Sequence, residues 1–200
     1  MKKDSIIVSV ISVILITLVV ASIFFTIFSM TTHNKLVEKR NEVYGQQAQI
    51  ENVLQARVEK IPDLVKVVER YDLHEEKVLI EVTKAREGFD NALKSGDMKA
   101  ISDADDQVTS ALYNLQVVVE NYPELKSSEN YTMLIDEISG SVNRIAQERR
   151  KYNQCVQEYN TLVEKMPTNI IALLYGFKPM PYFTASEEAH STNVVDFEDN

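Results

Sequence analysis

The sequence predicts an all-α protein with an N-terminal transmembrane helix, an antiparallel four-helix bundle of long helices, and a short C-terminal helix. Three observations predict this fold class. Residues 6–30 carry no charged side chain. After this run, apolar residues recur at spacings of three and four, the period of one helical face. The chain has only five Gly and five Pro in 200 residues, whereas β-rich folds need frequent turn residues.

The uncharged run is the first predicted element. As a helix it would extend about 37 Å, against a hydrocarbon core of about 30 Å. Its polar groups are Ser and Thr hydroxyls, which can bond to the helix's own carbonyls. A cleaved signal peptide would have a shorter apolar region, of about 7–15 residues, before a small-residue cleavage site. We therefore expect a retained single-pass anchor in the cell membrane.

The orientation of this anchor depends on the positive charges at its two ends. Lys2 and Lys3 precede the run, and Lys35, Lys39 and Arg40 follow it, so the charges nearly balance. The short tail with two lysines favours a cytoplasmic N-terminus and an extracytoplasmic domain.

Four helices are predicted after the anchor. The first carries Leu36, Val43 and Ile50, which are seven residues apart as in a coiled coil. A break is expected at residues 57–60, and Gly96 with Asp97 would end one helix and cap the next. The other predicted helices cover residues 62–95, 97–122 and 127–166, and a short apolar turn covers residues 169–175.

These elements predict four segments along the chain. Residues 1–5 form a short polar N-terminus and residues 6–30 the transmembrane anchor. Residues 31–177 form the helical bundle. Residues 178–200 form an extended acidic tail, because they include two prolines followed by five acids without an arginine or a further lysine.

Composition and motif content exclude several classes of function. The net charge of −9 argues against nucleic-acid binding, which depends on clustered Lys and Arg. A single cysteine, Cys155, excludes an internal disulfide and a multi-thiolate metal site. The three histidines do not form a known metal-ligand spacing, and no nucleophile elbow or phosphate loop is present. We therefore expect no metal, no cofactor and no enzymatic activity.

Several short stretches resemble a bacterial family of membrane-anchored helical proteins. They occur in the family's order from about residue 31 to the C-terminus, and they include NKLVEKRN at 34–41, IPDLV at 61–65, YDLHE at 71–75, ENYPELK at 120–126, RRKYN at 149–153 and YF at 182–183. This ordered set is similar to the LemA family. Where that family usually has Trp and, four residues later, Asp, this chain has Gln47 and Glu51. The resemblance implies an anchored four-helix bundle and does not imply a reaction.

A set of polar residues is predicted to lie in the core of the bundle. Glu75 and Glu148 fall on apolar stripes, where charged residues are rarely buried unless they are paired. Arginines on the same helices could pair with these carboxylates through bidentate hydrogen bonds. This network would either fix the helix register or form a polar pocket that a ligand could switch. Its candidate members are His74, Glu75, Arg86, Asn143, Arg144, Glu148, Arg149 and Asn153.

Aromatic residues beyond the bundle are the second candidate site. Tyr175, Phe177, Tyr182 and Phe183 lie where less core is available. They would either cap the end of the bundle or form an exposed patch for a partner, since aromatic residues are common at protein interfaces.

These features predict a LemA-type binding or scaffolding module that acts on another protein at the membrane. The alternative is a membrane-bound sensor or regulator that binds a small ligand through a polar patch in the bundle. The sequence predicts no nucleic-acid partner and leaves a homo-oligomer open.

Overall fold

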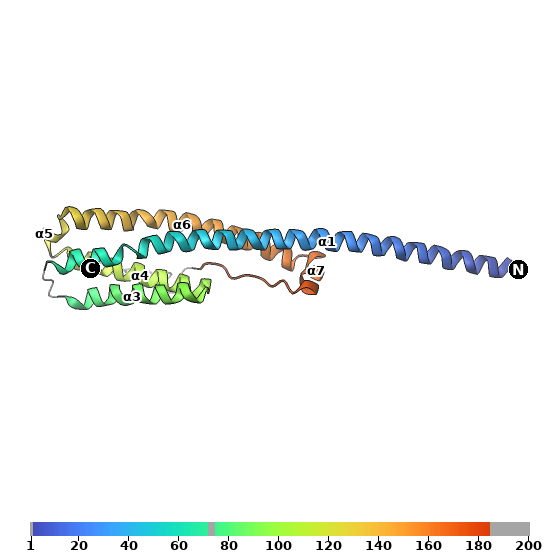
Figure 1. Cartoon of the computed structure of the whole chain (residues 1–200), viewed down its shortest axis with the longest axis horizontal. Helices are drawn as coiled ribbons and strands as arrows, with labels where there is room; N and C mark the ends of the chain where they lie inside the picture. Colours follow the sequence, from blue (N-terminus) through green and yellow to red (C-terminus); the bar gives the residue numbers. More distant parts are fainter. Residues whose placement is uncertain (1, 72–74, 185–200) are drawn as a thin grey trace, which may run out of the picture. The chain divides into compact units, whose positions relative to one another are not determined.

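The computed structural model describes residues 2–71 and 75–184, and every regular element in these ranges is a helix (Figure 1). The predictions for His74 and for the tail from residue 185 lie outside the described residues. The helices are α1 (Lys2–Val58), α2 (Ile61–Glu69), α3 (Glu76–Ser95), α4 (Met98–Val119), α5 (Pro123–Lys126), α6 (Glu129–Glu164) and α7 (Thr168–Tyr175). The all-α prediction is confirmed.

The chain divides into two compact units, which are described separately. The first unit contains residues 1–43 and 157–180, and the second contains residues 44–156 and the segment from 181 onward. Both α1 and α6 contribute residues to each unit.

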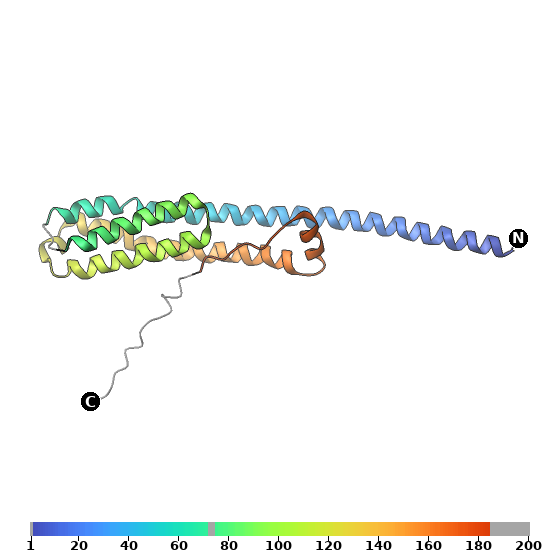
Figure 2. The same ribbon diagram turned by 90° about the horizontal axis from the view of Figure 1, so that it is seen from below.

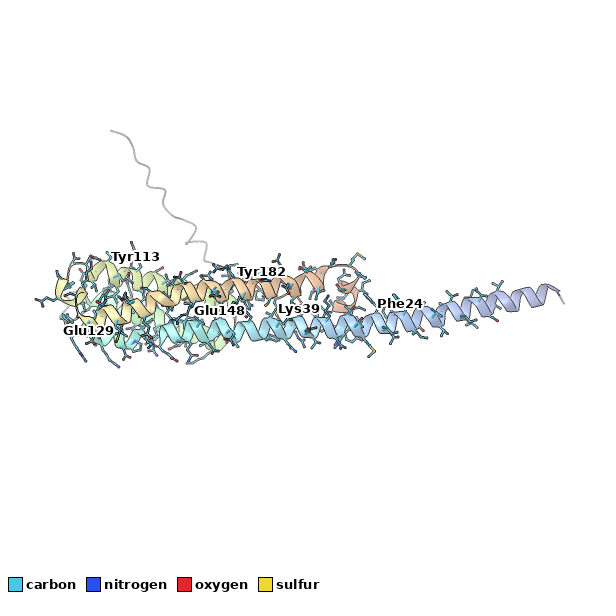
Figure 3. All side chains as sticks on the ribbon, turned by 90° about the horizontal axis from the view of Figure 1, so that it is seen from above. Phe24, Lys39, Tyr113, Glu129, Glu148 and Tyr182 are labelled. Carbon is cyan, nitrogen blue, oxygen red and sulfur yellow. The ribbon has the colours of Figure 1, made fainter. Side chains whose placement is uncertain are left out.

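The first unit contains the long apolar part of α1. By length and composition α1 could cross a membrane, and no residue of its apolar 18-residue window is buried. Figure 3 shows Phe24 projecting from it, and this side chain is 72% exposed. The hydroxyls of Thr17 and Thr26 donate to the carbonyls of Val13 and Ser22, each at 2.8 Å. These bonds confirm that hydroxyl groups in the run are satisfied within the helix.

The second unit contains a core of buried apolar residues. Helices α3 and α4 run side by side in opposite directions (Figure 2). Between them Gly96 has a positive φ of 68°, and the Asp97 carboxylate accepts a bond from the backbone N–H of Lys99 at 3.0 Å. The predicted stop and cap are therefore confirmed. Large buried side chains of this unit include Ile50, Leu54, Leu64, Phe89, Ile101, Leu115 and Tyr152.

The helix predicted over residues 62–95 differs from the structure. It is divided into α2, which ends at Glu69, and α3, which begins at Glu76. Glu75 has a non-helical backbone, with φ −112° and ψ 55°. Val68 and Val78 are both buried, so the apolar spacing continues across the interruption and conceals it. The break expected at residues 57–60 is confirmed, with Pro62 in the first turn of α2.

Candidate functional site

A buried ion pair lies in the second unit between α1 and α4. The Arg57 guanidinium donates to Asp105 Oδ1 at 2.9 Å, and both side chains are 4% exposed. Arg57 also donates to the Thr109 hydroxyl at 3.1 Å. That hydroxyl donates in turn to the backbone carbonyl of Asp105 at 2.9 Å. The three side chains therefore form one connected polar cluster, which runs from the buried Arg57–Asp105 pair to the exposed Thr109.

The charges of this pair are incompletely compensated. Burial raises the pKa of the Asp105 carboxyl above its ordinary value, and the attraction of Arg57 and Arg149 only partly opposes this shift. The pair has one direct charged hydrogen bond, and Arg57 Nε has no acceptor among the described residues. Buried donors without a partner are rare in native proteins, because desolvation without a bond costs about 1–3 kcal/mol. The free donor makes this cluster a candidate binding point.

A cavity of about 330 Å³ adjoins Arg57. Its wall combines apolar side chains with three basic groups, one carboxylate and two uncharged polar groups. In this wall Lys60 pairs with Glu137 at 2.9 Å. No described residue accepts a hydrogen bond or ion pair from Arg144, which is exposed. The geometry suits a small molecule with an apolar body and an anionic group. The lining residues are Asn52, Val53, Ala56, Arg57, Lys60, Glu137, Ile138, Ser141 and Arg144.

In this unit α6 side chains also form hydrogen bonds with the backbone of the segment that begins at Pro181. We call this arrangement a grip. Asn153 accepts a bond from the backbone N–H of Phe183 and donates one to its carbonyl, both at 2.8 Å. The Tyr152 hydroxyl donates to the carbonyl of Pro181 at 3.0 Å. Burial raises the pKa of Tyr152 to about 12, so its hydroxyl keeps the proton that it donates. The Arg149 guanidinium lies 4.5 Å from the centre of the Phe183 ring.

The first unit contains the same kind of grip. Asn160 accepts from the backbone N–H of Met180 at 2.8 Å and donates to its carbonyl at 2.9 Å. The Tyr159 hydroxyl donates to the carbonyl of Lys178 at 3.0 Å. A Tyr-Asn pair on α6 therefore holds the backbone of an extended segment in each unit.

The residues predicted as a polar core network lie in several different places. Arg149 and Asn153 both contact Phe183. Glu148 is 18% exposed and accepts from Lys151 at 2.8 Å and from Gln46 at 2.6 Å.

The hydrogen bonds from Lys151 and Gln46 outweigh the effect of burial and lower the pKa of the Glu148 carboxyl, and Lys151 is the largest cause. Figure 3 shows Glu148 on α6. Glu75 is exposed just before α3, and Arg86 pairs with Asp90 of its own helix at 3.4 Å. Asn143 and Arg144 are exposed.

The predicted aromatic surface is divided between buried and exposed residues. Phe177 and Phe183 are 8% and 2% exposed, whereas Tyr175 and Tyr182 are 52% and 42% exposed. Two functional candidates, Arg57 and Asp105, were missed by the sequence reasoning.

Their signal was available in the sequence. Asp105 lies on the stripe of Ile101, Val108 and Leu112, a charged residue at an apolar position. The same reasoning that selected Glu75 and Glu148 applies to it.

Comparison with known proteins gives one family match and several relatives. The model of the LemA family matches residues 46–197. Protein LemA of Metamycoplasma hominis is 24% identical over 174 residues, covering 87% of this chain and 78% of that protein. Magnetosome protein MamQ of Magnetospirillum gryphiswaldense is 33% identical over 88 residues, covering 44% of this chain and 32% of that protein. Magnetosome protein MamQ 2 of Paramagnetospirillum magneticum is 36% identical over the same length, again 32% of that protein. The matched part of this chain thus spans about a third of the MamQ proteins.

Proposed function

Because the chain belongs to the LemA family, we propose that it is a helical module held in the cell membrane by α1, which binds another protein and catalyses no reaction. The observation that carries this proposal is the apolar surface of α1. Every large apolar side chain from Val10 to Ile27 is more than half exposed. A soluble protein rarely exposes a continuous apolar area of this size, whereas a bilayer would cover it.

The domain of this module is proposed to be an antiparallel four-helix bundle. In the second unit, α3 pairs with α4, and Arg57 of α1 pairs with Asp105 of α4. Lys60, just after α1, pairs with Glu137 of α6. A carbodiimide that joins touching amines and carboxylates directly should link Lys60 to Glu137, and mass spectrometry of the digested protein would detect the joined peptides. The control is Lys60→Arg, which has no amine to couple and should give no link at this position. If the wild-type protein also gives no link there, the arrangement is contradicted.

Helix α4 offers a candidate surface for a protein partner. Tyr113 and Val117 are one turn apart and are 66% and 51% exposed, and Figure 3 shows Tyr113 projecting from the helix. Tyrosine is enriched at interfaces because it joins a rigid apolar ring to a polar tip. A photo-crosslinking amino acid at position 113, used in intact membranes, should capture one defined protein. The matched control is the exposed Lys94 on α3. If position 113 gives no crosslinked protein, or if positions 113 and 94 give the same products, the proposed docking surface is wrong.

A second candidate function is the binding of a small anionic ligand. The cavity beside Arg57 favours it, because Arg57 Nε lacks an acceptor and Arg144 carries a free charge at the same cavity. Benzoate would test the site, with benzamide as its uncharged analogue. Saturation-transfer NMR on the detergent-solubilised full chain should show contact with benzoate, and Arg144→Gln should weaken it. Equal signals from benzoate and benzamide would exclude an anion site.

The orientation of the module is proposed to place the domain outside the cytoplasm, since Lys2 and Lys3 lie on the short N-terminal side. A protease added to cells with a permeabilised wall or outer membrane should then remove a C-terminal tag. A tag that survives until the inner membrane is broken would place the domain in the cytoplasm.

A further inference from the structure

The short helix α7 has an exposed apolar face that its own unit leaves uncovered. Ile170, Leu173 and Leu174 follow the three-four spacing of one helical face, and they are 53%, 83% and 66% exposed. Met166, just before the helix, is 71% exposed. The opposite side is buried, with Ile171 at 0%. The helix is therefore attached to its unit by one side and presents apolar side chains on the other.

This helix lies beside the end of the apolar part of α1, in the same unit (Figure 1). The Tyr175 hydroxyl is 3.5 Å from the Ser29 hydroxyl. The Tyr175 ring also packs edge-on against the His33 ring, with 4.7 Å between their centres. Ser29 is at the end of the uncharged run and His33 just after it. The contacts therefore place α7 at the level where the proposed membrane span would leave the hydrocarbon.

The distribution of charged residues around α7 also agrees with a position at the membrane surface. Residues 166–177 contain no charged side chain, and they are bounded by the exposed Lys165 and Lys178. Lysines at the ends of an apolar segment can reach phosphate groups while the segment contacts lipid. Tyrosine is enriched at this depth because its ring is apolar and its hydroxyl is polar.

We propose that the exposed face of α7 lies in the interfacial layer of the bilayer that α1 spans, so that the first unit contacts lipid through two helices. The ligand class is a phospholipid surface, with the flanking lysines favouring anionic headgroups. This inference rests on the proposed anchoring by α1. A single spanning helix would rotate and tilt freely, whereas a second contact at the surface would fix the angle at which the first unit leaves the membrane.

The test uses the fact that the chain contains no tryptophan. Three full-length variants, each with a single tryptophan, are reconstituted into vesicles of phosphatidylcholine and phosphatidylglycerol with brominated acyl chains, which quench nearby indole rings. Leu173→Trp reports on α7. Phe24→Trp reports on the proposed span. Asn41→Trp is the matched exposed control on the same helix, about 16 Å beyond Met30 along α1.

We expect the emission of Leu173→Trp to be quenched, more strongly by bromines near the headgroup than by bromines near the chain end. Phe24→Trp should show quenching by the deeper bromines, and Asn41→Trp should show none. If Leu173→Trp behaves like Asn41→Trp while Phe24→Trp is quenched, the interfacial helix is wrong and the anchor stands. If Phe24→Trp is also unquenched, the proposed anchoring itself fails. Leu173 is 83% exposed, so its replacement removes no core contact.

Discussion

At the scale of single residues, the Arg57–Asp105 pair places two charged groups in the interior of the second unit. A buried ion pair gains its Coulomb attraction only after both charges have been stripped of water. Here one direct bond joins the two groups, Arg57 also donates to Thr109, and Arg57 Nε has no acceptor among the described residues. The pair is therefore a weak source of stability, but removing one partner leaves a buried charge.

Asp105→Ala should destabilise the protein by about 3–5 kcal/mol, because it leaves Arg57 buried without its acceptor. Urea unfolding of the detergent-solubilised chain would measure the free energy of unfolding. Asp103→Ala is the matched control on the same helix. Asp103 pairs with Lys99 at the surface at 2.8 Å, and such exposed pairs are worth about 0–1 kcal/mol. Equal losses in the two variants would contradict the account of the buried pair.

Asp105→Asn should behave differently, because the amide oxygen can still accept from Arg57 without a negative charge. The pKa of Asp105 is raised in the folded state, so the folded protein binds its proton more tightly than the unfolded chain does. The stability that proton binding at Asp105 contributes is complete below the ordinary aspartate pKa of 3.8. It declines as the pH rises from there through the pKa of Asp105 in the folded protein. As the pH rises over this range, the free energy of unfolding of the wild-type protein should therefore fall relative to that of Asp105→Asn. A gain in its stability relative to Asp105→Asn would show that Arg57 outweighs burial.

Individual contacts were harder to predict from the sequence than the positions of the helices. An acidic residue on an apolar stripe signals either a buried pair or an edge of the core, and spacing alone does not distinguish them. Glu75 lies on such a stripe, yet it is exposed because the helix is interrupted before Glu76. Asp105 lies on a stripe within an unbroken helix and is buried. Which of the two became a core residue was decided by the backbone.

At the scale of elements, α6 holds the extended segment near the C-terminus through two similar grips. Tyr152-Asn153 and Tyr159-Asn160 are seven residues apart, and the residues gripped by the two asparagines, Met180 and Phe183, are three apart. Seven helical residues and three extended residues each cover about 10 Å. The repeat in the helix therefore matches the repeat in the extended chain. This Tyr-Asn repeat was visible in the sequence, but its meaning depended on knowing that residues 178–183 return to the same helix.

Asn153→Asp should release the segment in the second unit. Aspartate keeps the acceptor for the Phe183 N–H but puts a second oxygen against the Phe183 carbonyl. The two bonds are part-buried, so the cost of the unsatisfied carbonyl should not exceed the about 1–3 kcal/mol of a buried group, which corresponds to roughly 5- to 150-fold in opening. Hydrogen exchange of the peptide containing Phe183 would measure this loss. Asn143→Asp, at an exposed position of α6, should leave the exchange unchanged; if both variants or neither exchange faster, the grip is not what holds the segment.

The turn between α3 and α4 offers a paired test of backbone conformation. Gly96→Ala should cost about 1 kcal/mol, because φ is +68° there and a side chain disfavours this region. Gly140→Ala, in the interior of α6 with open space around the added carbon, should stabilise the protein by about 0.5–1 kcal/mol. The two variants should shift the urea midpoint in opposite directions. Shifts of the same sign would contradict the assigned turn.

The helices themselves were largely predictable because their period, glycines and prolines are local signals. The stop at Gly96, the cap at Asp97 and the short α7 ending at Gly176 all followed from such signals. The interruption between α2 and α3 did not, since the apolar residues on both sides face the same core. The continuity of α1 from the apolar run to Val58 was left open by the sequence and is present in the structure.

At the scale of the whole molecule, the account depends on where the apolar part of α1 resides. LemA-family membership covers residues 46–197, which lie after this stretch. The proposed protein contact at Tyr113, the lipid contact at α7 and the outward orientation all assume that residues 6–30 remain in the membrane. The exposed apolar side chains of this run are the physical reason for that assumption.

The most direct test of anchoring is alkaline carbonate extraction of membranes that contain the C-terminally tagged full-length chain, followed by the intact mass of the extracted protein. The account predicts that the chain stays in the membrane pellet at its full mass of 22.8 kDa plus the tag. It also predicts that the double variant Leu15→Glu/Val19→Glu moves to the soluble fraction, because charged side chains are costly at the centre of a bilayer. A wild-type chain recovered in the soluble fraction, or shortened by the loss of its first 30 residues or so, would contradict the membrane anchor.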